Sequence, residues 1–377
     1  MGFWNARERN VDELLVGIEF GDLFVNSRGK PALGEEILRT IGTARNSVII
    51  INPIVSDGRL VNEILAARKR GVRVKLITEL RENRKTGIKY PTRGFEVEDK
   101  CQLDEHFEAI RRLAISGVHC RGCRYYTHAK VIIADNNQAI ISSANGNANS
   151  LGWGPQLSFE AGIKFDKQGF VSNFFAIATQ LWDLCPFRMQ LLENDISLQE
   201  SAVDKQKNFS YDTMISEQCR LVWSFPPKGK ALRDSLVSLV RRAEKKITCI
   251  ALSFYDTNKV QGLHIALLEA LSRGVKVTVI VRREHFEDNN YPDEATKELL
   301  ENGLRLLGMT GMHAKGMLVD NSYCAIFSGN FNPFSLDSDV DSANVEIGLC
   351  DFEKEGLLSS YGKLIALLED AADFEYR

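Results

Sequence analysis

The clearest signal along the chain is a pattern of hydrophobic and polar positions that occurs twice in the same order. The first copy comprises an apolar run at 48–52, an amphipathic stretch at 60–68 and the run RGVRVKLI at 70–77. The second copy places the same three features at 247–252, 263–271 and 273–280. Short apolar runs predict buried strands, whereas apolar residues three and four apart predict helices with one buried face. The pattern therefore predicts two strand–helix–strand units of an α/β protein.

Downstream of these units a longer segment is also repeated. THAKVIIADNNQAIISSAN at 127–145 matches MHAKGMLVDNSYCAIFSGN at 312–330. The polar residues that recur in both segments are His128, Lys130, Asp135, Ser143 and Asn145 in the first and His313, Lys315, Asp320, Ser328 and Asn330 in the second. A glutamate follows each segment, Glu160 in FEAGI and Glu346 in VEIGL. We therefore predict a duplicated α/β module, with an N-terminal half at 1–195, a linker at 196–218 and a C-terminal half at 219–377.

The His-x-Lys spacing predicts which way these side chains point. Residues two apart on a strand share a face, so the histidine and lysine of each copy lie together. Asp135-Asn136-Asn137 and Asp320-Asn321-Ser322 are turn sequences that close each strand into a hairpin. The returning strand brings the repeated serine and asparagine back to the His-Lys end. Each aspartate is out of phase with its histidine, so it either supports the site or only caps the turn.

This set of side chains suits the cleavage of a phosphodiester. The two lysines and two asparagines are donors that can hold the non-bridging phosphate oxygens. One histidine can attack phosphorus while the other protonates the leaving oxygen, because imidazole titrates near neutrality. Glu160 and Glu346 are placed to orient the ring nitrogens that do not react. The charges balance without a metal, so we expect neither a metal nor an organic cofactor.

Composition and charge restrict the class of protein further. The chain has 377 residues, 44% of them hydrophobic, and a net charge of −3. Its apolar runs are of strand length, so we expect no integral membrane association. The start, MGFWNARERN, lacks the pattern of a secretory signal, and we therefore expect a cytoplasmic protein. The near-neutral charge excludes a basic surface over the whole protein, so a polyanionic substrate needs a local basic patch.

The cysteines offer one alternative that involves a metal. Eight cysteines are scattered along a long chain, a pattern typical of reduced thiols rather than of a disulfide framework. Cys120 and Cys123 form the one closely spaced pair, and a zinc ion would need two further ligands, for which His119 and Cys101 are candidates. No second Cys-x2-Cys or His-x3-His motif accompanies them, so packed thiols are the favoured interpretation.

The paired motifs resemble the signature of the phospholipase D superfamily, His-x-Lys-x4-Asp-x6-Gly-Ser-x-Asn. The resemblance covers both hairpins, the upstream strand–helix units and the downstream glutamates. It implies an α/β/α sandwich with a mixed sheet in each half, related by a pseudo-two-fold axis, and an active site between the halves. It also implies a phosphohistidine intermediate, with His128 as the nucleophile and His313 as the general acid, although the sequence alone allows the reverse assignment.

The chain departs from that signature at the glycine before the serine. Ser142 takes this place in the first copy and Phe327 in the second, where Gly329 follows the serine instead. Glycine permits close backbone approach to a ligand, so we expect the second phosphate-binding turn to have a different shape. No reacting group is lost, which favours an active enzyme over an inactive relative.

Sequence features around the first motif suggest a nucleic-acid substrate. The first half contains an insertion with a polar loop whose basic residues are Arg81, Arg84, Lys85, Lys89 and Arg93. Arg124, Tyr126 and Trp153 lie close to the first motif in sequence. Basic residues interleaved with aromatic ones suit a nucleic-acid strand, with phosphates on the cations and bases on the rings. A solvated surface loop is an equally ordinary explanation of the charged segment.

Three classes of function stay open. The segment SSANGNANSLG resembles prokaryotic phospholipase-D-like nucleases of restriction and phage-defence systems, which implies DNA or RNA as substrate and partner proteins of a defence complex. The alternative is a phospholipase D or phosphatidyltransferase acting on phospholipid head groups, which would need a membrane-docking face. The third is a nucleic-acid-binding subunit that keeps the fold without cleaving. None of these features predicts the oligomeric state.

Overall fold

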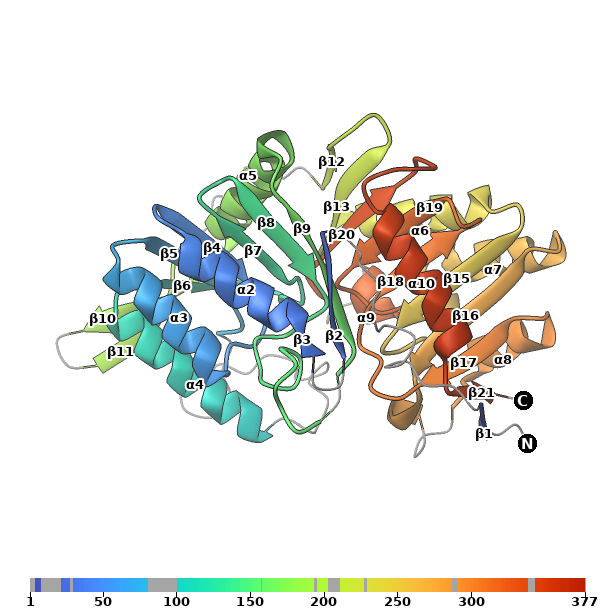
Figure 1. Cartoon of the computed structure of the whole chain (residues 1–377), viewed down its shortest axis with the longest axis horizontal. Helices are drawn as coiled ribbons and strands as arrows, with labels where there is room; N and C mark the ends of the chain where they lie inside the picture. Colours follow the sequence, from blue (N-terminus) through green and yellow to red (C-terminus); the bar gives the residue numbers. More distant parts are fainter. Residues whose placement is uncertain are drawn as a thin grey trace.

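The computed structural model describes residues 4–7, 22–27, 30–80, 100–156, 158–192, 195–202, 211–226, 229–286, 291–337 and 343–376. Within these ranges each half of the chain builds one mixed β-sheet with helices on both faces (Figure 1). The N-terminal half, blue to green, lies beside the C-terminal half, yellow to red. The predicted duplicated α/β/α architecture is therefore confirmed.

The sheet of the N-terminal half has the strand order β11-β10-β6-β5-β4-β7-β8-β9-β2-β3. These strands are β2 (Leu23–Ser27), β3 (Lys30–Pro31), β4 (Ser47–Ile51), β5 (Arg73–Ile77), β6 (His119–Gly122), β7 (Val131–Ala134), β8 (Gln138–Ser142), β9 (Glu160–Phe165), β10 (Phe187–Leu192) and β11 (Asp195–Glu200). Strands β4, β5 and β6 are parallel, and β7 and β8 form the hairpin that carries the first motif. Parallel neighbours need crossover helices, which is why helical segments separate these strands in the sequence.

The sheet of the C-terminal half repeats this arrangement, with the order β1-β21-β17-β16-β15-β18-β19-β20-β13-β12 and β14 paired with β13. These strands are β1 (Trp4–Ala6), β12 (Asp212–Met214), β13 (Cys219–Phe225), β14 (Gly229–Lys230), β15 (Lys246–Ala251), β16 (Lys276–Arg282), β17 (Arg305–Met309), β18 (Gly316–Val319), β19 (Tyr323–Phe327), β20 (Glu346–Asp351) and β21 (Phe374–Tyr376). Strands β15, β16 and β17 are parallel, and β18 and β19 form the second motif hairpin. The central strands of the two sheets therefore correspond one to one.

Helices cover both faces of each sheet. Those of the N-terminal half are α2 (Ala32–Thr43), α3 (Gly58–Lys69), α4 (Lys100–Ile115) and α5 (Gln168–Leu184). Those of the C-terminal half are α6 (Ala231–Arg242), α7 (Leu263–Ser272), α8 (Glu294–Glu301), α9 (Pro333–Leu336) and α10 (Ser359–Ala371), with short 3-10 turns at Thr257–Lys259 and Arg283–Phe286. None of the helices in the described ranges is both long enough and apolar enough to cross a membrane.

Three hydrophobic cores hold these layers together. Residues of α2, α3 and α4 pack with one face of the N-terminal sheet, and residues of α6, α7 and α8 pack with the corresponding face of the C-terminal sheet. Helices α5 and α10 lie on the opposite faces, where Phe174 and Tyr361 belong to one central core shared by both sheets. Because a continuous apolar core joins the halves, they form one body rather than two domains on a tether.

Local sequence explains why the repeated elements begin and end where they do. The Asp57 side chain caps α3 by accepting hydrogen bonds from the backbone amides of Arg59 and Leu60, at 2.8 and 2.9 Å. Gly71 and Gly274, with φ of 89° and 83°, follow the ends of α3 and α7 in the left-handed region that glycine tolerates best. The glycine of each Arg-Gly-Val run is therefore a helix stop.

The structure differs from the predicted division of the chain in two places. Strand β1 pairs with β21, so the first described segment belongs to the C-terminal sheet and not to a half spanning 1–195. Within the described part of the predicted linker at 196–218, residues 196–200 and 212–214 are strand, because β11 pairs with β10 and β12 pairs with β13. Polar composition suggested a linker, whereas edge strands tolerate polar residues because one side of each faces water.

Candidate active site

The two halves exchange backbone hydrogen bonds at the start of each motif. The backbone amides of His128 and Ala129 donate to the Val345 carbonyl, at 2.9 and 3.0 Å. By the same pattern, His313 and Ala314 donate to the carbonyl of Phe159, at 3.0 and 2.8 Å. Each His-Lys strand is thus joined to the strand that carries the glutamate of the other half.

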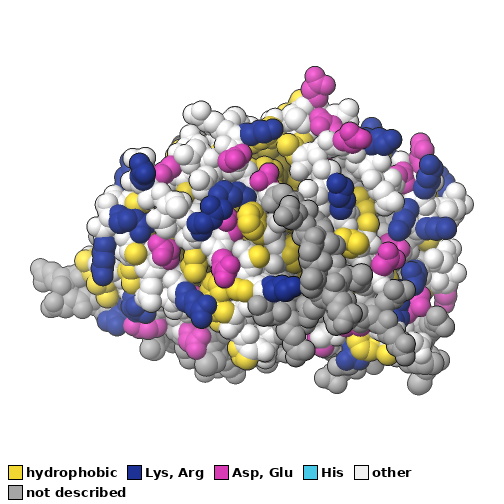
Figure 2. Space-filling view, in the orientation of Figure 1, with side chains coloured by type: hydrophobic (Ala, Val, Ile, Leu, Met, Phe, Trp, Pro, Cys, Tyr) yellow, Lys and Arg dark blue, Asp and Glu magenta, His cyan; other side chains and the backbone are white. Residues whose placement is uncertain are grey.

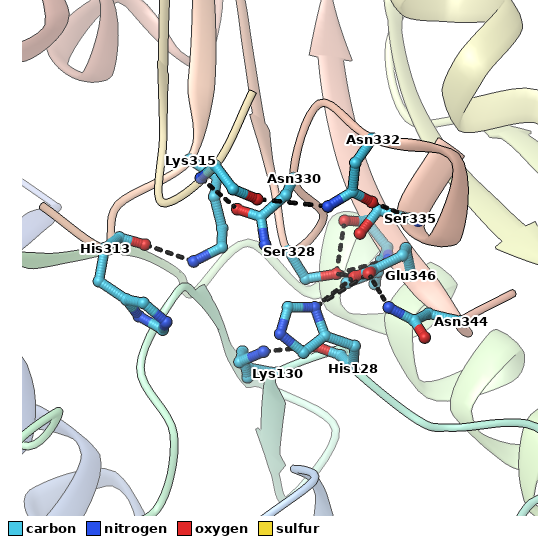
Figure 3. Close-up of polar contacts among 12 residues, drawn as sticks. His128, Lys130, His313, Lys315, Ser328, Asn330, Asn332, Ser335, Asn344 and Glu346 are labelled. Atoms are coloured by element: carbon cyan, nitrogen blue, oxygen red, sulfur yellow. Dashed lines mark hydrogen bonds and ion pairs between the residues drawn. The ribbon is translucent and has the colours of Figure 1, made fainter. Parts of the chain in front are cut away.

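This exchange pairs each histidine with the glutamate of the opposite half. Nδ1 of His128 lies 2.9 and 3.0 Å from the two carboxylate oxygens of Glu346. Nδ1 of His313 lies 2.6 Å from Oε1 of Glu160, within ion-pair distance but not aligned as a hydrogen bond. Figure 3 shows both imidazoles, with Lys130 and Lys315, around one space at the meeting of the halves. A complete site therefore needs both halves of the chain.

Further polar side chains hold the two glutamates, which are both fully buried. Glu160 accepts hydrogen bonds from Ser143 and, at 2.8 Å, from Ser158. Glu346 accepts equivalent bonds from Ser328 and, at 3.2 Å, from Asn344. Sequence reasoning missed Ser158 and Asn344, although both stand two positions before their glutamate and so share its strand face. With these partners each carboxylate is fixed to orient one imidazole.

The two motif lysines are buried close to the histidines. Lys130 and Lys315 are 1% and 0% exposed, and each amino group donates to the carbonyl of its own motif histidine, at 2.7 and 2.6 Å. Burial lowers the pKa of Lys130 well below its ordinary value, and the charge of Lys315 lowers it further. Two buried ammonium groups close together favour the binding of an anion. A bound anion would raise the pKa of each lysine and so keep both groups charged.

Burial also governs the titration of the histidines and glutamates. It lowers the pKa of His128 to about 4 and that of His313 to about 3, despite the opposing effect of the paired carboxylates. Burial by itself raises the pKa of Glu160, but His313 and Lys315 outweigh it and lower that pKa to about 2. At neutral pH each pair therefore combines a neutral imidazole, with Nδ1 toward the carboxylate, and an ionised carboxylate, and Nε2 is left as the reactive nitrogen.

The two motif asparagines have different surroundings. Asn330 is 8% exposed, and its Oδ1 accepts a 3.4 Å hydrogen bond from the backbone amide of Ser253. Oδ1 of Asn145 is buried and has no hydrogen-bond partner among the described residues. The backbone around Asn145 is instead fixed by Asn52, which bonds the carbonyl of Ala144 and the amide of Gly146, each at 3.1 Å. The turns that carry the two asparagines are therefore built differently.

Asp135 and Asp320 lie at the hairpin turns, where they bind backbone. Asp135 accepts hydrogen bonds from three successive amides, those of residues 45–47, at 2.7 to 2.8 Å. Asp320 does the same with residues 244–246, at 2.8 to 2.9 Å. Both aspartates have positive φ, 51° and 53°, at the first position of the three-residue connections 135–137 and 320–322. These contacts tie each turn to the start of a central strand.

A buried tyrosine contacts the second motif only. The hydroxyl of Tyr361, on α10, donates to the Lys315 carbonyl at 2.7 Å, while the strand bond from the amide of Phe327 to that carbonyl is 3.5 Å long. A Cβ at Gly316 would lie 2.5 Å from the Tyr361 ring, so this position has room only for glycine. Val131 occupies the equivalent position in the first motif.

The predicted substrate-binding residues are only partly within the described structure. Arg81, Arg84, Lys85, Lys89 and Arg93 all lie outside the described residues. Tyr126 stacks beside His128, with ring centroids 5.8 Å apart and planes 28° apart. Arg124 is ion-paired with Glu200 of β11. The indole nitrogen of Trp153 donates to Asp57 at 2.7 Å, so this ring fastens its loop to the start of α3. Of these residues, the structure brings Tyr126 to the histidines.

The two cysteines considered for zinc face different cores. Cys120 packs in the outer core of the N-terminal half, whereas Cys123 lies in the central core. The sulfur of Cys123 is 2.7 Å from that of Cys185, which belongs to the same central core. Within the described ranges no three His, Cys, Asp or Glu side chains gather as metal ligands. The zinc alternative therefore has no geometric support at this pair.

Comparisons with known proteins extend these observations. A family model described as "Cardiolipin synthase, PLD-like domain" matches residues 37–182 and 236–355. Phosphatidylserine synthase from Haemophilus influenzae is similar in structure, with a TM-score of 0.63 at 12% identity over 95% of this chain and 88% of that protein. Polyphosphate kinase from Porphyromonas gingivalis has a TM-score of 0.56 at 13% identity over 89% of this chain and 44% of that protein. These two likenesses show a shared fold.

Two other comparisons carry less information. Nuc from Salmonella typhimurium, a phospholipase D family member, matches 43% of this chain and 95% of its own at 21% identity, with a TM-score of only 0.35. A search of curated protein sequences found no match. The family model, in contrast, spans more than half of the chain and contains both His-x-Lys-x4-Asp motifs. By that match and by its paired motifs, the chain belongs to the PLD-like family that the model describes, within the phospholipase D superfamily.

Proposed function

We propose that this protein is a metal-independent phosphodiesterase that acts through a covalent phosphohistidine intermediate, and that its substrate is a nucleic acid. The observation that carries the proposal is the crossed pairing of two histidines with two buried glutamates beside two buried lysines. Both carboxylates are already occupied by imidazole and hydroxyl partners, so the lysines supply the positive charge that a phosphate requires.

In the proposed reaction Nε2 of His128 attacks phosphorus, forming a P–N bond as the ester P–O bond breaks. The leaving oxygen takes its proton from Nε2 of His313. Water then attacks phosphorus, gives its proton to His313 and releases His128 as the P–N bond breaks. His313 must be protonated in the first step, and the charge of the bound phosphodiester raises its pKa from the low value of the free site.

Two observations support a nucleic acid as the substrate. Tyr126 places an aromatic face beside His128, where a base next to the scissile phosphate would lie. In the described ranges the large exposed hydrophobic side chains are scattered over α4, β10, β12 and α7, at Ile115, Leu191, Met214 and Ile265. Single exposed side chains do not form the continuous apolar face that docking on a membrane requires. A role in phage defence, with partner proteins, rests on the loop resemblance alone.

The second candidate is transfer or hydrolysis of a phospholipid head group. The description of the family model names cardiolipin synthase, and one structural neighbour is a phosphatidylserine synthase. The reacting groups would be the same, because a phospholipid head group is also joined by a phosphodiester. Only the second ester substituent and the acceptor differ between the two candidates.

One experiment separates the candidates. Wild-type protein is incubated in excess EDTA with labelled single- and double-stranded DNA, with RNA, and with phosphatidylglycerol–phosphatidylethanolamine vesicles. We expect cleavage of nucleic acid that is lost in His128→Ala and kept in His119→Ala, a matched change at an exposed histidine of β6. Turnover of vesicles alone would favour the lipid enzyme. Turnover that appears only after a divalent metal is restored would contradict the mechanism, and binding without any cleavage would favour the docking subunit.

A further inference from the structure

Strands β5, β6 and β10 of the N-terminal sheet have one covered face and one open face. They lie on the side of that sheet away from the C-terminal half (Figure 1). Their covered face carries Val74, Leu76, Cys120 and Phe187, which pack with α3 and α4 in the outer core. On the opposite face α5 packs mainly on β4, β7 and β8. The other face of β5, β6 and β10 is therefore left largely to solvent.

The open face of these strands carries cations. Because side chains alternate along a strand, the residues between the packed ones point to this face. They include Arg73 and Lys75 of β5, Arg121 of β6 and Arg188 of β10, all of them exposed or half-buried. Arg188 is the direct cross-strand partner of Arg121, and Lys75 is the partner of the exposed His119. We refer to Arg73, Lys75, Arg121 and Arg188 as the basic patch.

A tryptophan near the end of α5 fixes the middle of the basic patch. The amino group of Lys75 lies 5.1 Å from the centroid of the Trp182 ring, and the guanidinium of Arg121 lies 4.6 Å from it. Arg121 also donates to the Trp182 carbonyl at 2.8 Å. Both cations are thus on the face of the sheet that α5 covers in part, as strand alternation indicates.

The basic patch has few negative charges to balance it. None of its four cations forms an ion pair with a carboxylate of the described residues. Strands β5, β6 and β10 contain no acidic residue, and the neighbouring acid is Asp183 of α5, which lies near Cys185 together with Arg121. Like charges directly opposite on a sheet destabilise it, so the pairing of Arg121 with Arg188 favours an anion bound between them.

We propose that the basic patch is an anchoring surface outside the catalytic site, which binds the phosphate backbone of a nucleic-acid substrate. The inference rests on the proposed function and adds where a long strand is held. Cations that neutralise phosphates release counterions, which favours binding of any sequence. Arg121 and His128 are seven positions apart, so their Cα atoms are at most about 25 Å apart. A strand of about 30 nucleotides, roughly 100 Å long when stacked, can therefore touch both.

The side chains around the basic patch favour nucleic acid over a membrane surface. A protein that docks on anionic lipids usually adds apolar side chains that enter the bilayer. The large exposed hydrophobic residue of these strands is Leu191, and it points to the opposite face because it alternates with Arg188 in the same phase as Phe187. The patch offers charge without an apolar anchor.

The test measures binding of a fluorescein-labelled 30-nucleotide DNA duplex, in EDTA, to His128→Ala protein at several salt concentrations. Combining Lys75→Gln with Arg188→Gln in this protein should weaken binding. It should also reduce the slope of log Kd against log salt concentration by about two, because each lost phosphate contact removes about 0.9. Lys75→Arg with Arg188→Lys keeps both charges and should keep the slope.

A matched control is Lys69→Gln with Arg241→Gln, which removes two exposed cations on α3 and α6. It should leave the slope unchanged. The inference is wrong if the patch variant keeps the slope of its parent or if both double variants reduce it equally. It is also wrong if the patch variant loses binding only to phosphatidylglycerol vesicles, which would assign the surface to a membrane. Failure of wild type to hydrolyse bis(p-nitrophenyl) phosphate would instead contradict the proposed function, whatever the binding result.

Discussion

His128 and His313 occupy equivalent positions in the two halves, and their nearest partners are also equivalent: a glutamate of the opposite half and a lysine two residues on. The residues around these groups are not equivalent. The first motif has an aromatic neighbour in Tyr126, whereas the second has Gly316 and the hydroxyl of Tyr361. The groups proposed to bind the phosphate are symmetric, whereas the residues around them are not.

The crossed pairing explains why the inner groups stay alike. Each half lends its glutamate to the other, so a change in one half would disable an imidazole in the other. The outer side chains differ between the halves, so each half presents different chemistry beside its histidine. The following predictions test this comparison between the halves.

The largest expected effect comes from the histidines themselves. His128→Ala and His313→Ala should each lower turnover of a natural phosphodiester by at least about a thousandfold, because covalent and proton-transfer catalysis depend on them. The two histidines can be distinguished with a substrate labelled at phosphorus, by stopping the reaction with acid and measuring the label that is bound to the protein. Protein-bound label should be absent in His128→Ala and detectable in His313→Ala. Label in His128→Ala alone would reverse the two roles.

Substitution of the two glutamates tests the crossed pairing. Glu346→Gln and Glu160→Gln should each lower turnover by about a hundredfold or more, because an amide favours the wrong imidazole tautomer. With a p-nitrophenolate leaving group, which needs no general acid, the loss in Glu160→Gln should shrink while that in Glu346→Gln persists. The opposite pattern, with protein-bound label still confined to His313→Ala, would mean that each glutamate serves the histidine of its own half, in conflict with the distances above.

The histidine pKa values predict a loss of stability in mild acid. The unfolded chain takes up protons on histidine near pH 6.5, whereas folded His128 resists protonation down to about pH 4. The free energy of unfolding should therefore fall between these pH values, by about 1.4 kcal/mol per pH unit for each such histidine. Urea unfolding at pH 7, 6 and 5 measures this slope. His128→Gln should make it shallower by one histidine, whereas His119→Gln, at an exposed position, should not change it.

The smallest effect should come from the tyrosine that contacts only the second half. Tyr361→Phe leaves the ring in place but removes the hydrogen bond to the Lys315 carbonyl, which leaves a buried acceptor with one long strand bond. We expect a loss of about 1–3 kcal/mol of stability and a fall in kcat larger than any change in KM. Tyr323→Phe, at a partly exposed position of β19, is the control. Equal effects of the two changes would argue against a role for Tyr361 at the site.

The sequence by itself determined the elements that depend on short-range periodicity. Two strand–helix–strand units, two hairpins and the glycines that end α3 and α7 follow from patterns a few residues long. The repeated histidines, lysines and asparagines were also identified from the sequence, although His128 and Lys130 lie just before β7 rather than on a strand. Asp135 and Asp320 left two interpretations open, and their backbone contacts at the turns are known only from the structure.

Only the tertiary structure decided how distant segments meet. The crossed glutamates, the addition of β1 to the C-terminal sheet, and the contact of Tyr361 with the second motif join residues far apart in sequence. The ring contact between Tyr125 and Phe225 likewise joins one half to the other. Periodicity indicates which face of a strand is buried but not which strand lies beside it, because pairing depends on the packing of the whole chain.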